Sequence, residues 1–154
     1  MKLSEAASWA EIVSAVGLVI SLIYVGVSVR QNTDAITAAN HQNLLSMDME
    51  KNAWFRDREF SELYVSALSD IEELSPAQLR QFRTFVSDQI NIWEYVYIAH
   101  ESGLLNDTIW EGYNEFYSGQ MKLPAYRFIW EQSKEGWTGG FAAHVESVLE
   151  DTPD

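Results

Sequence analysis

The stretch "IVSAVGLVISLIYVGVSV", residues 12–29, contains 18 consecutive residues without a charge and is the strongest indication of how this chain is organised. A helix rises about 1.5 Å per residue, so this run spans about 27 Å, close to the thickness of the hydrocarbon core of a bilayer. Trp9 precedes the run and Arg30 follows it, as is typical of residues at a membrane interface. No later charge-free apolar run is as long. We therefore predict a single transmembrane helix within residues 1–30.

A cleaved signal peptide and a buried helix are the two alternatives to a membrane anchor for this run. The "GVS" at residues 26–28 has the small residues of a signal-peptidase site, and a buried helix of a soluble protein can also be this apolar. The amino-terminal segment "MKLSEAASWAE" sets Lys2 and the terminal amine against Glu5 and Glu11, whereas a signal peptide begins with a positive region. The sequence favours a retained anchor.

Within the run, small residues recur along one edge of the predicted helix. Positions seven apart differ in direction by about 20°, so a shared edge contains Ser14, Ser21 and Ser28, with Gly17 and Tyr24 between them. We call these five residues the small-residue edge. In lipid, small side chains let two helices approach closely and bond across the contact. The edge therefore predicts a homo-oligomer.

Two alternatives to self-association remain for the serines. A serine in a helix can donate to the carbonyl four residues before it, which would make this segment a plain anchor. Rings of Ser14, Ser21 and Ser28 could instead line a polar pore in an oligomeric ion channel.

The same spacing recurs beyond the run, at Gln42, Leu45 and Met49. Residues 27–53 contain neither Pro nor Gly, so we expect one long helix to pass from the apolar segment into the remaining chain without a joint.

The rest of the chain, residues 31–154, carries the whole formal net charge of −13. Such a surface repels phosphate backbones, which excludes a nucleic-acid partner and makes cations possible partners. The chain has no cysteine, which removes disulfides, thiolate metal sites and cysteine catalysis.

Local signals divide residues 31–154 into helices. Ser75, Pro76 and Gln78 have the spacing of a capping box at the start of a helix, whose apolar residues on two sides predict a central position. Gly103 is a predicted helix end, and Asn106 or Asp107 begins the next helix. Further helices are expected in "EFSELYVSALSDI" before Ser75, in "PAYRFIWEQSKE" at residues 124–135 and around Phe141. No sustained alternation predicts a strand, so the domain is expected to be an all-α bundle.

A search for chemistry in this domain finds no catalytic set. None of His41, His100 and His144 has a glutamate three residues before it, as a di-iron bundle would require, and no nucleophile elbow or phosphate-binding loop is present. We predict no enzyme, no cofactor and no metal. Glu94 and His100 are kept only as a weak candidate for a ligand or metal site. Trp54 and Trp137, near predicted helix ends, are candidates for surface contacts.

The segment "SLIYVGVSVRQNTDAITAANHQ", residues 21–42, resembles the start of a family of uncharacterised bacterial proteins. In that family an N-terminal membrane helix ends in a SLIYxxxxxRQNT-type signature and precedes a helical acidic domain. The resemblance implies the bacterial inner membrane and a cytoplasmic C-terminal domain, and it brings no activity or catalytic residue. Arg30 is the only basic residue of the flank after the membrane helix in this chain, where the family is often richer in arginine.

Together these patterns predict an all-α, single-span membrane protein with two parts, an anchor at 1–30 and an acidic helical domain at 31–154. Its expected partners are the lipid bilayer and further copies of itself, in the role of an assembly or scaffold protein. An ion channel and a membrane-tethered ligand-binding domain are the alternatives.

Overall fold

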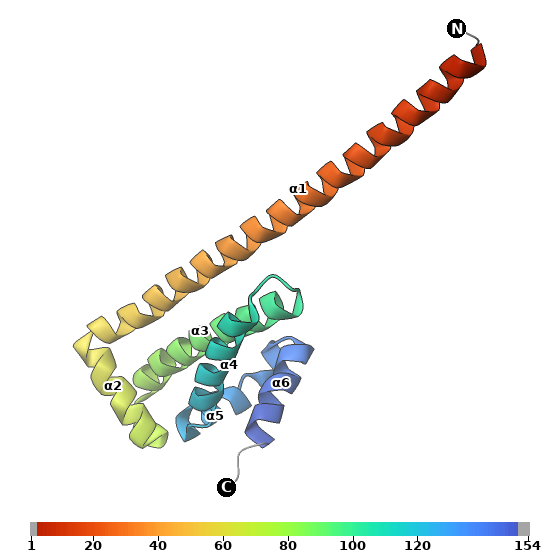
Figure 1. Cartoon of the computed structure of the whole chain (residues 1–154). Coiled ribbons are helices and arrows are strands. Elements are labelled where there is room, and N and C mark those ends of the chain that lie inside the picture. The colour runs from red at the N-terminus through yellow and green to blue at the C-terminus, as the bar shows by residue number, and fades with distance from the viewer. Residues whose placement is uncertain (1–2, 151–154) are drawn as a thin grey trace. The chain divides into compact units, whose positions relative to one another are not determined.

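The computed structural model describes residues 3–150, with side chains from Trp9 onward. Within these residues the chain is entirely helical apart from turns, and no strand is present, which confirms the all-α prediction (Figure 1). The six α-helices are α1 (Leu3–Ala53), α2 (Arg58–Ser69), α3 (Pro76–Glu101), α4 (Asp107–Met121), α5 (Pro124–Glu131) and α6 (Gly139–Glu150). Short 3-10 helices lie at Trp54–Arg56 (η1), Ile71–Glu73 (η2) and Lys134–Gly136 (η3).

The chain divides into two units, Met1–Ala38 and Ala39–Asp154. The described part of the first unit is a single stretch of α1. The second unit is compact and contains the last part of α1 and all later helices. As expected from the lack of Pro and Gly in residues 27–53, α1 has no break before Ala53.

Helix α3 is the central element of the compact unit. Ser75 accepts a hydrogen bond from the Gln78 amide, and the Gln78 side chain accepts one from the Ser75 amide, so the predicted capping box is present. Gly103 ends the helix at φ 67°, a conformation that glycine adopts without strain. The amides of Gly103 and Leu104 donate to the carbonyls of His100 and Ala99, which satisfies the last carbonyls of α3.

The core forms around α3 because this helix has apolar residues on two sides. Phe82, Val86, Trp93 and Val96 are completely buried, and Ile92 and Ala99 are buried on a second side. The neighbouring helices α2, α4, α5 and α6 all pack against α3. This confirms its predicted central position.

One local prediction from the sequence is wrong. The helix expected at residues 124–135 ends at Glu131, where the Ser133 hydroxyl donates to the Ile129 carbonyl and η3 follows. The two candidates for surface contacts, Trp54 and Trp137, are partly buried: Trp54 lies 4.9 Å from Phe60 between ring centroids, and Trp137 stacks on Trp130 at 6.4 Å. Both rings sit at helix ends, but neighbouring aromatic side chains cover them.

Candidate functional site

The apolar segment of α1 is exposed at every position except Ser28, which is half-exposed. Among the residues that the structure describes, one helix near the N-terminus is long and apolar enough to cross a membrane, and none of the residues in its most apolar stretch is buried. Leu22, for example, is 72% exposed. Apolar side chains that are exposed over so many turns indicate a lipid or protein surface that covers them.

The residues of the small-residue edge lie in this segment. Ser14, Gly17, Ser21 and Tyr24 are exposed, and Ser28 is half-exposed. The interfacial candidates Trp9 and Arg30 are exposed as well. At Gly17 an added Cβ would meet no atom within 4 Å, so this position is open to a neighbouring helix.

Hydroxyl groups in this part of α1 bond to their own helix. Ser21 Oγ donates to the Gly17 carbonyl at 2.9 Å, and Thr33 Oγ1 donates to the Val29 carbonyl at 3.1 Å. A hydroxyl proton that is used in this way needs no water, which is the usual solution for a serine in an apolar helix. This geometry fits a plain anchor and a close-packed edge equally well.

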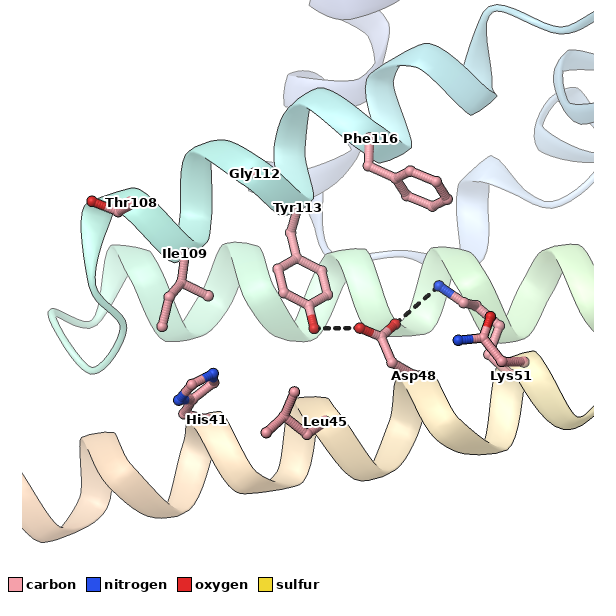
Figure 2. Close-up of a pocket in the computed structure, with 10 residues that line it drawn as sticks. His41, Leu45, Asp48, Lys51, Thr108, Ile109, Gly112, Tyr113 and Phe116 are labelled. Atoms are coloured by element: carbon pink, nitrogen blue, oxygen red, sulfur yellow. Dashed lines mark hydrogen bonds and ion pairs between the residues drawn. The ribbon is translucent and has the colours of Figure 1, made fainter.

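The compact unit contains a second candidate site, a groove of about 530 Å³ between the end of α1 and α4. Figure 2 shows side chains of the two helices pointing toward one another across it. The groove is lined by His41, Leu45, Asp48, Lys51 and Asn52 of α1 and by Thr108, Ile109, Gly112, Tyr113 and Phe116 of α4. We call these ten residues the α1/α4 groove.

A polar cluster at the base of the α1/α4 groove connects the two helices. Asp48 accepts hydrogen bonds from the Tyr113 hydroxyl at 2.5 Å and from Lys51 Nζ at 2.9 Å (Figure 2). Lys51 Nζ also lies 3.5 Å from the Tyr117 hydroxyl and 5.0 Å from the ring centroid of Phe116. The Lys51 side chain is only 11% exposed, so its charge depends on the Asp48 carboxylate and the rings around it.

The cluster holds Tyr113 as a neutral donor. Burial, the hydrogen bond to Asp48 and the negative charge of that carboxylate all raise the pKa of Tyr113 above its ordinary value. Burial likewise raises the pKa of Tyr117, with a smaller effect from Asp48. Both phenols therefore keep their protons at physiological pH. The Asp48 carboxylate therefore holds Lys51 and Tyr113 in place through these two hydrogen bonds.

Glu94 and His100, the weak ligand candidates, bond to different parts of the chain. Glu94 Oε1 accepts from the Thr138 amide at 2.8 Å, just before α6 begins. The His100 ring stacks on Trp110 at 4.8 Å and 11°, and its Nε2 lies 3.3 Å from Asp107 Oδ1. In the part of the chain that the structure describes, no three His, Asp or Glu residues are grouped as metal ligands.

His144 has a structural environment that the sequence did not indicate. Its Nε2 lies 2.7 Å from Asn114 Oδ1, which also accepts from Trp93 Nε1 at 3.0 Å, so Nε2 of His144 carries a proton and donates. The ring packs against Tyr97 at 5.5 Å between centroids. Burial lowers the pKa of His144, and the charge of Glu101 opposes this only in part.

The α1/α4 groove was missed by sequence reasoning. Leu45 was singled out by its spacing, but the pairing of Asp48 with Tyr113 joins residues 65 positions apart. Asp48 and Lys51 are three residues apart in a helix, a spacing that predicts an ion pair. This spacing does not indicate a groove. Comparisons with protein-family models, with curated proteins and with solved structures found no match for this chain.

Proposed function

We propose that this chain is a non-enzymatic, single-span protein of the bacterial inner membrane. In this proposal the acidic helical domain lies in the cytoplasm and the protein assembles with further copies of itself. The observation that carries the proposal is the apolar stretch of α1, which has a mean hydropathy of 2.4 in its 18-residue window and is unburied along that window.

The absence of a cover within the described residues supports the membrane assignment. A helix that served as the core of a soluble domain would be buried by its neighbours, whereas the apolar side chains of residues 12–29 are exposed. Exposing such a surface to water is costly, at about 25 cal/mol for each Å² of apolar area. Lipid removes this cost along the whole segment.

Self-association is supported by the open space at the small-residue edge. Gly17 leaves room for a second backbone, and Ser21, with its hydroxyl bonded within the helix, adds no unpaired donor to the contact. A second copy brings the same edge at the same depth in the membrane. A symmetric pair can therefore form from one kind of surface.

Membrane location is tested by fractionation of cells that express the full chain. We expect the protein to stay with membranes in alkaline carbonate and to dissolve in detergent. The size of the chain must be unchanged on a denaturing gel, since signal-peptide cleavage would shorten it. Recovery of the protein in the soluble fraction, or a shortened product, would contradict the proposal.

Orientation is tested with a cysteine at Glu59, an exposed position in α2. A cytoplasmic domain predicts that a membrane-impermeant maleimide labels the variant Glu59→Cys only after the cells are broken. Because the natural chain has no cysteine, all labelling comes from this position. Labelling of intact spheroplasts would place the domain on the other side.

The oligomer is tested by disulfide crosslinking of single cysteines in membranes. We expect crosslinks at positions 14, 17, 21 and 28 to form faster than at positions 12, 19 and 23, which lie on the opposite side of a helix with 3.6 residues per turn. Equal crosslinking rates at the two sets of positions would mean that the segment is a plain membrane anchor. Conductance of the purified protein in a planar bilayer would favour the ion-channel alternative instead.

A membrane-tethered ligand-binding domain is the second candidate function, and the α1/α4 groove is the observation that favours it. Its volume of about 530 Å³ lies in the range of small-molecule sites. A small molecule that copurifies with the protein and is identified by mass spectrometry would support this candidate. Retention of that molecule by the variant Gly112→Leu, which fills the groove, would show that it binds elsewhere.

A further inference from the structure

We infer that the α1/α4 groove is the surface on which the domain of a second copy docks. The inference rests on the proposed homo-oligomer and adds a second contact, in the compact unit, to the one proposed in the membrane. The occupant is the same face of the partner, so the contact is symmetric.

The groove has both the hollow and the projections that a symmetric contact needs. In a two-fold interface one surface packs against its own copy, so projections and recesses must occur together on that surface. Gly112 lines the groove without a side chain, and an added Cβ there would meet no atom within 4 Å, so this position leaves room for a side chain of the partner. Leu45 and Phe116 project beside it and are 50% and 48% exposed, and Met49, one turn beyond Leu45 on α1, is 67% exposed.

Charge favours this face over other parts of the domain. Two copies that each carry a net charge of −13 repel one another wherever acidic residues meet. In the α1/α4 groove the only carboxylate is that of Asp48, and Lys51 pairs with it at 2.9 Å. Apart from His41, the other lining residues have uncharged side chains. The ten residues of the groove therefore contribute no unpaired carboxylate to a contact between two copies.

The polar groups at the base of the groove favour a protein occupant over a small molecule. A small-molecule site usually presents a few convergent polar groups that are free to bond the ligand. Asp48, Lys51 and Tyr113 already bond to one another. The groove then offers an occupant the apolar side chains of Leu45, Ile109 and Phe116, beside the polar groups of His41, Asn52 and Thr108. Half-exposed Leu45 and Phe116 of a second copy match that surface.

Anchoring in one membrane would strengthen a contact of modest size. Once two anchors pair, the two domains are held at a high effective concentration, and the second contact becomes intramolecular. The contact at the groove can therefore bury less surface area than the interface of a dimer that is stable in solution.

The experiment uses the full chain in membranes and a short bis-maleimide crosslinker. A cysteine is placed at Met49, beside the groove, and in a separate control at Val65 of α2, which is equally exposed at 64% but does not line the groove. We expect the variant Met49→Cys to give a covalent dimer and Val65→Cys to give little. Adding Gly112→Leu to Met49→Cys fills the recess and should slow dimer formation about tenfold.

A matched control is available on the same helix. Gly119 also lies in α4, an added Cβ there meets no atom within 4 Å, and it does not line the groove. The variant Gly119→Leu should leave crosslinking at position 49 unchanged. A thermal melt of each variant confirms that the domain is folded.

Three outcomes would overturn the inference: equal crosslinking at positions 49 and 65, no effect of Gly112→Leu, or an equal effect of Gly119→Leu. If the cysteines at positions 14, 17, 21 and 28 still crosslink preferentially in those cases, the proposed membrane oligomer stands and only the docking surface is lost. If position 49 crosslinks and depends on Gly112 while the membrane positions show no preference, the docking surface stands without the small-residue edge. A copurifying small molecule displaced by Gly112→Leu, with crosslinking unchanged, would assign the groove to a ligand.

Discussion

The two units of this chain differ in whether their apolar side chains are buried. In the first unit Leu22 and its neighbours are exposed along α1, and no other described element of that unit covers them. In the second unit Trp93 and Trp130 are completely buried among side chains from several helices. The same driving force acts on both, but the compact unit satisfies it within one chain, whereas the first unit requires lipid or another molecule.

The largest expected difference between the units comes from removing a large side chain. The variant Trp93→Ala should destabilise the domain by about 3–5 kcal/mol, because it leaves a cavity beside Phe141 and Tyr117 and removes a donor to Asn114. Leu22→Ala should leave domain stability unchanged. Urea unfolding of the full chain in detergent, followed by tryptophan fluorescence and circular dichroism, measures both; equal losses would mean that the two units unfold together.

A charge in the apolar segment should affect membrane insertion and not the domain. An arginine at the centre of a membrane helix costs about 2.5–3.5 kcal/mol on insertion scales. Ile20→Arg is therefore expected to lower the carbonate-resistant fraction, while Val65→Arg, at an exposed position of α2, leaves it unchanged. If Ile20→Arg inserted as well as the natural chain, residues 12–29 would not be the membrane span.

Replacing one serine in each unit should give a smaller difference in the free energy of unfolding. Ser75 caps α3, so Ser75→Ala should destabilise the domain by about 1 kcal/mol. Ser21 donates only to its own helix, and Ser21→Ala should have no effect on domain unfolding. The midpoints of urea unfolding for both variants test this pair. A loss from Ser21→Ala comparable to that from Ser75→Ala would show that α1 is thermodynamically coupled to the core.

The smallest effect expected is a pH dependence from His144. Its pKa is lowered in the folded domain, so below its unfolded pKa of about 6.5 the unfolded chain binds the proton more readily. Stability from this group is present above that pH and is lost as the pH falls toward and through the folded pKa.

The variant His144→Gln should flatten this part of the stability curve, because a glutamine amide can still donate to Asn114 without titrating. His41→Gln, at an exposed position, is the matched control and should leave the curve as it is. Unfolding midpoints between about pH 5 and pH 8 measure the difference. An unchanged slope in His144→Gln would assign the pH dependence to other groups.

Local features of the fold were predictable from the sequence because their causes lie within a few residues. The capping box of Ser75 and Gln78 and the glycine at position 103 act on the backbone next to them. The helix predicted at residues 124–135 was too long because, after Glu131, the amides of Gln132 and Ser133 donate to carbonyls three residues before them and the chain turns into η3.

The small-residue edge and the α1/α4 groove also differ in whether their causes lie within a few residues of sequence. The small-residue edge depends on helical spacing alone, so Ser14, Gly17 and Ser21 were recognisable as a set. The α1/α4 groove depends on which face of α1 packs against the domain. Leu44 is buried while Leu45 is half-exposed, and spacing alone gives no reason to separate these neighbours.

By itself the sequence determined the all-α class, the charge-free run at residues 12–29 and the ends of α3, because periodicity, length and capping are properties of neighbouring residues. The tertiary structure alone decided that Asp48 pairs with Tyr113, that Asn114 joins His144 to Trp93, and that Trp54 and Trp137 are covered by other aromatic rings. These contacts join residues distant in the chain, and they form because the core buries apolar area and pairs most of the polar groups that it encloses.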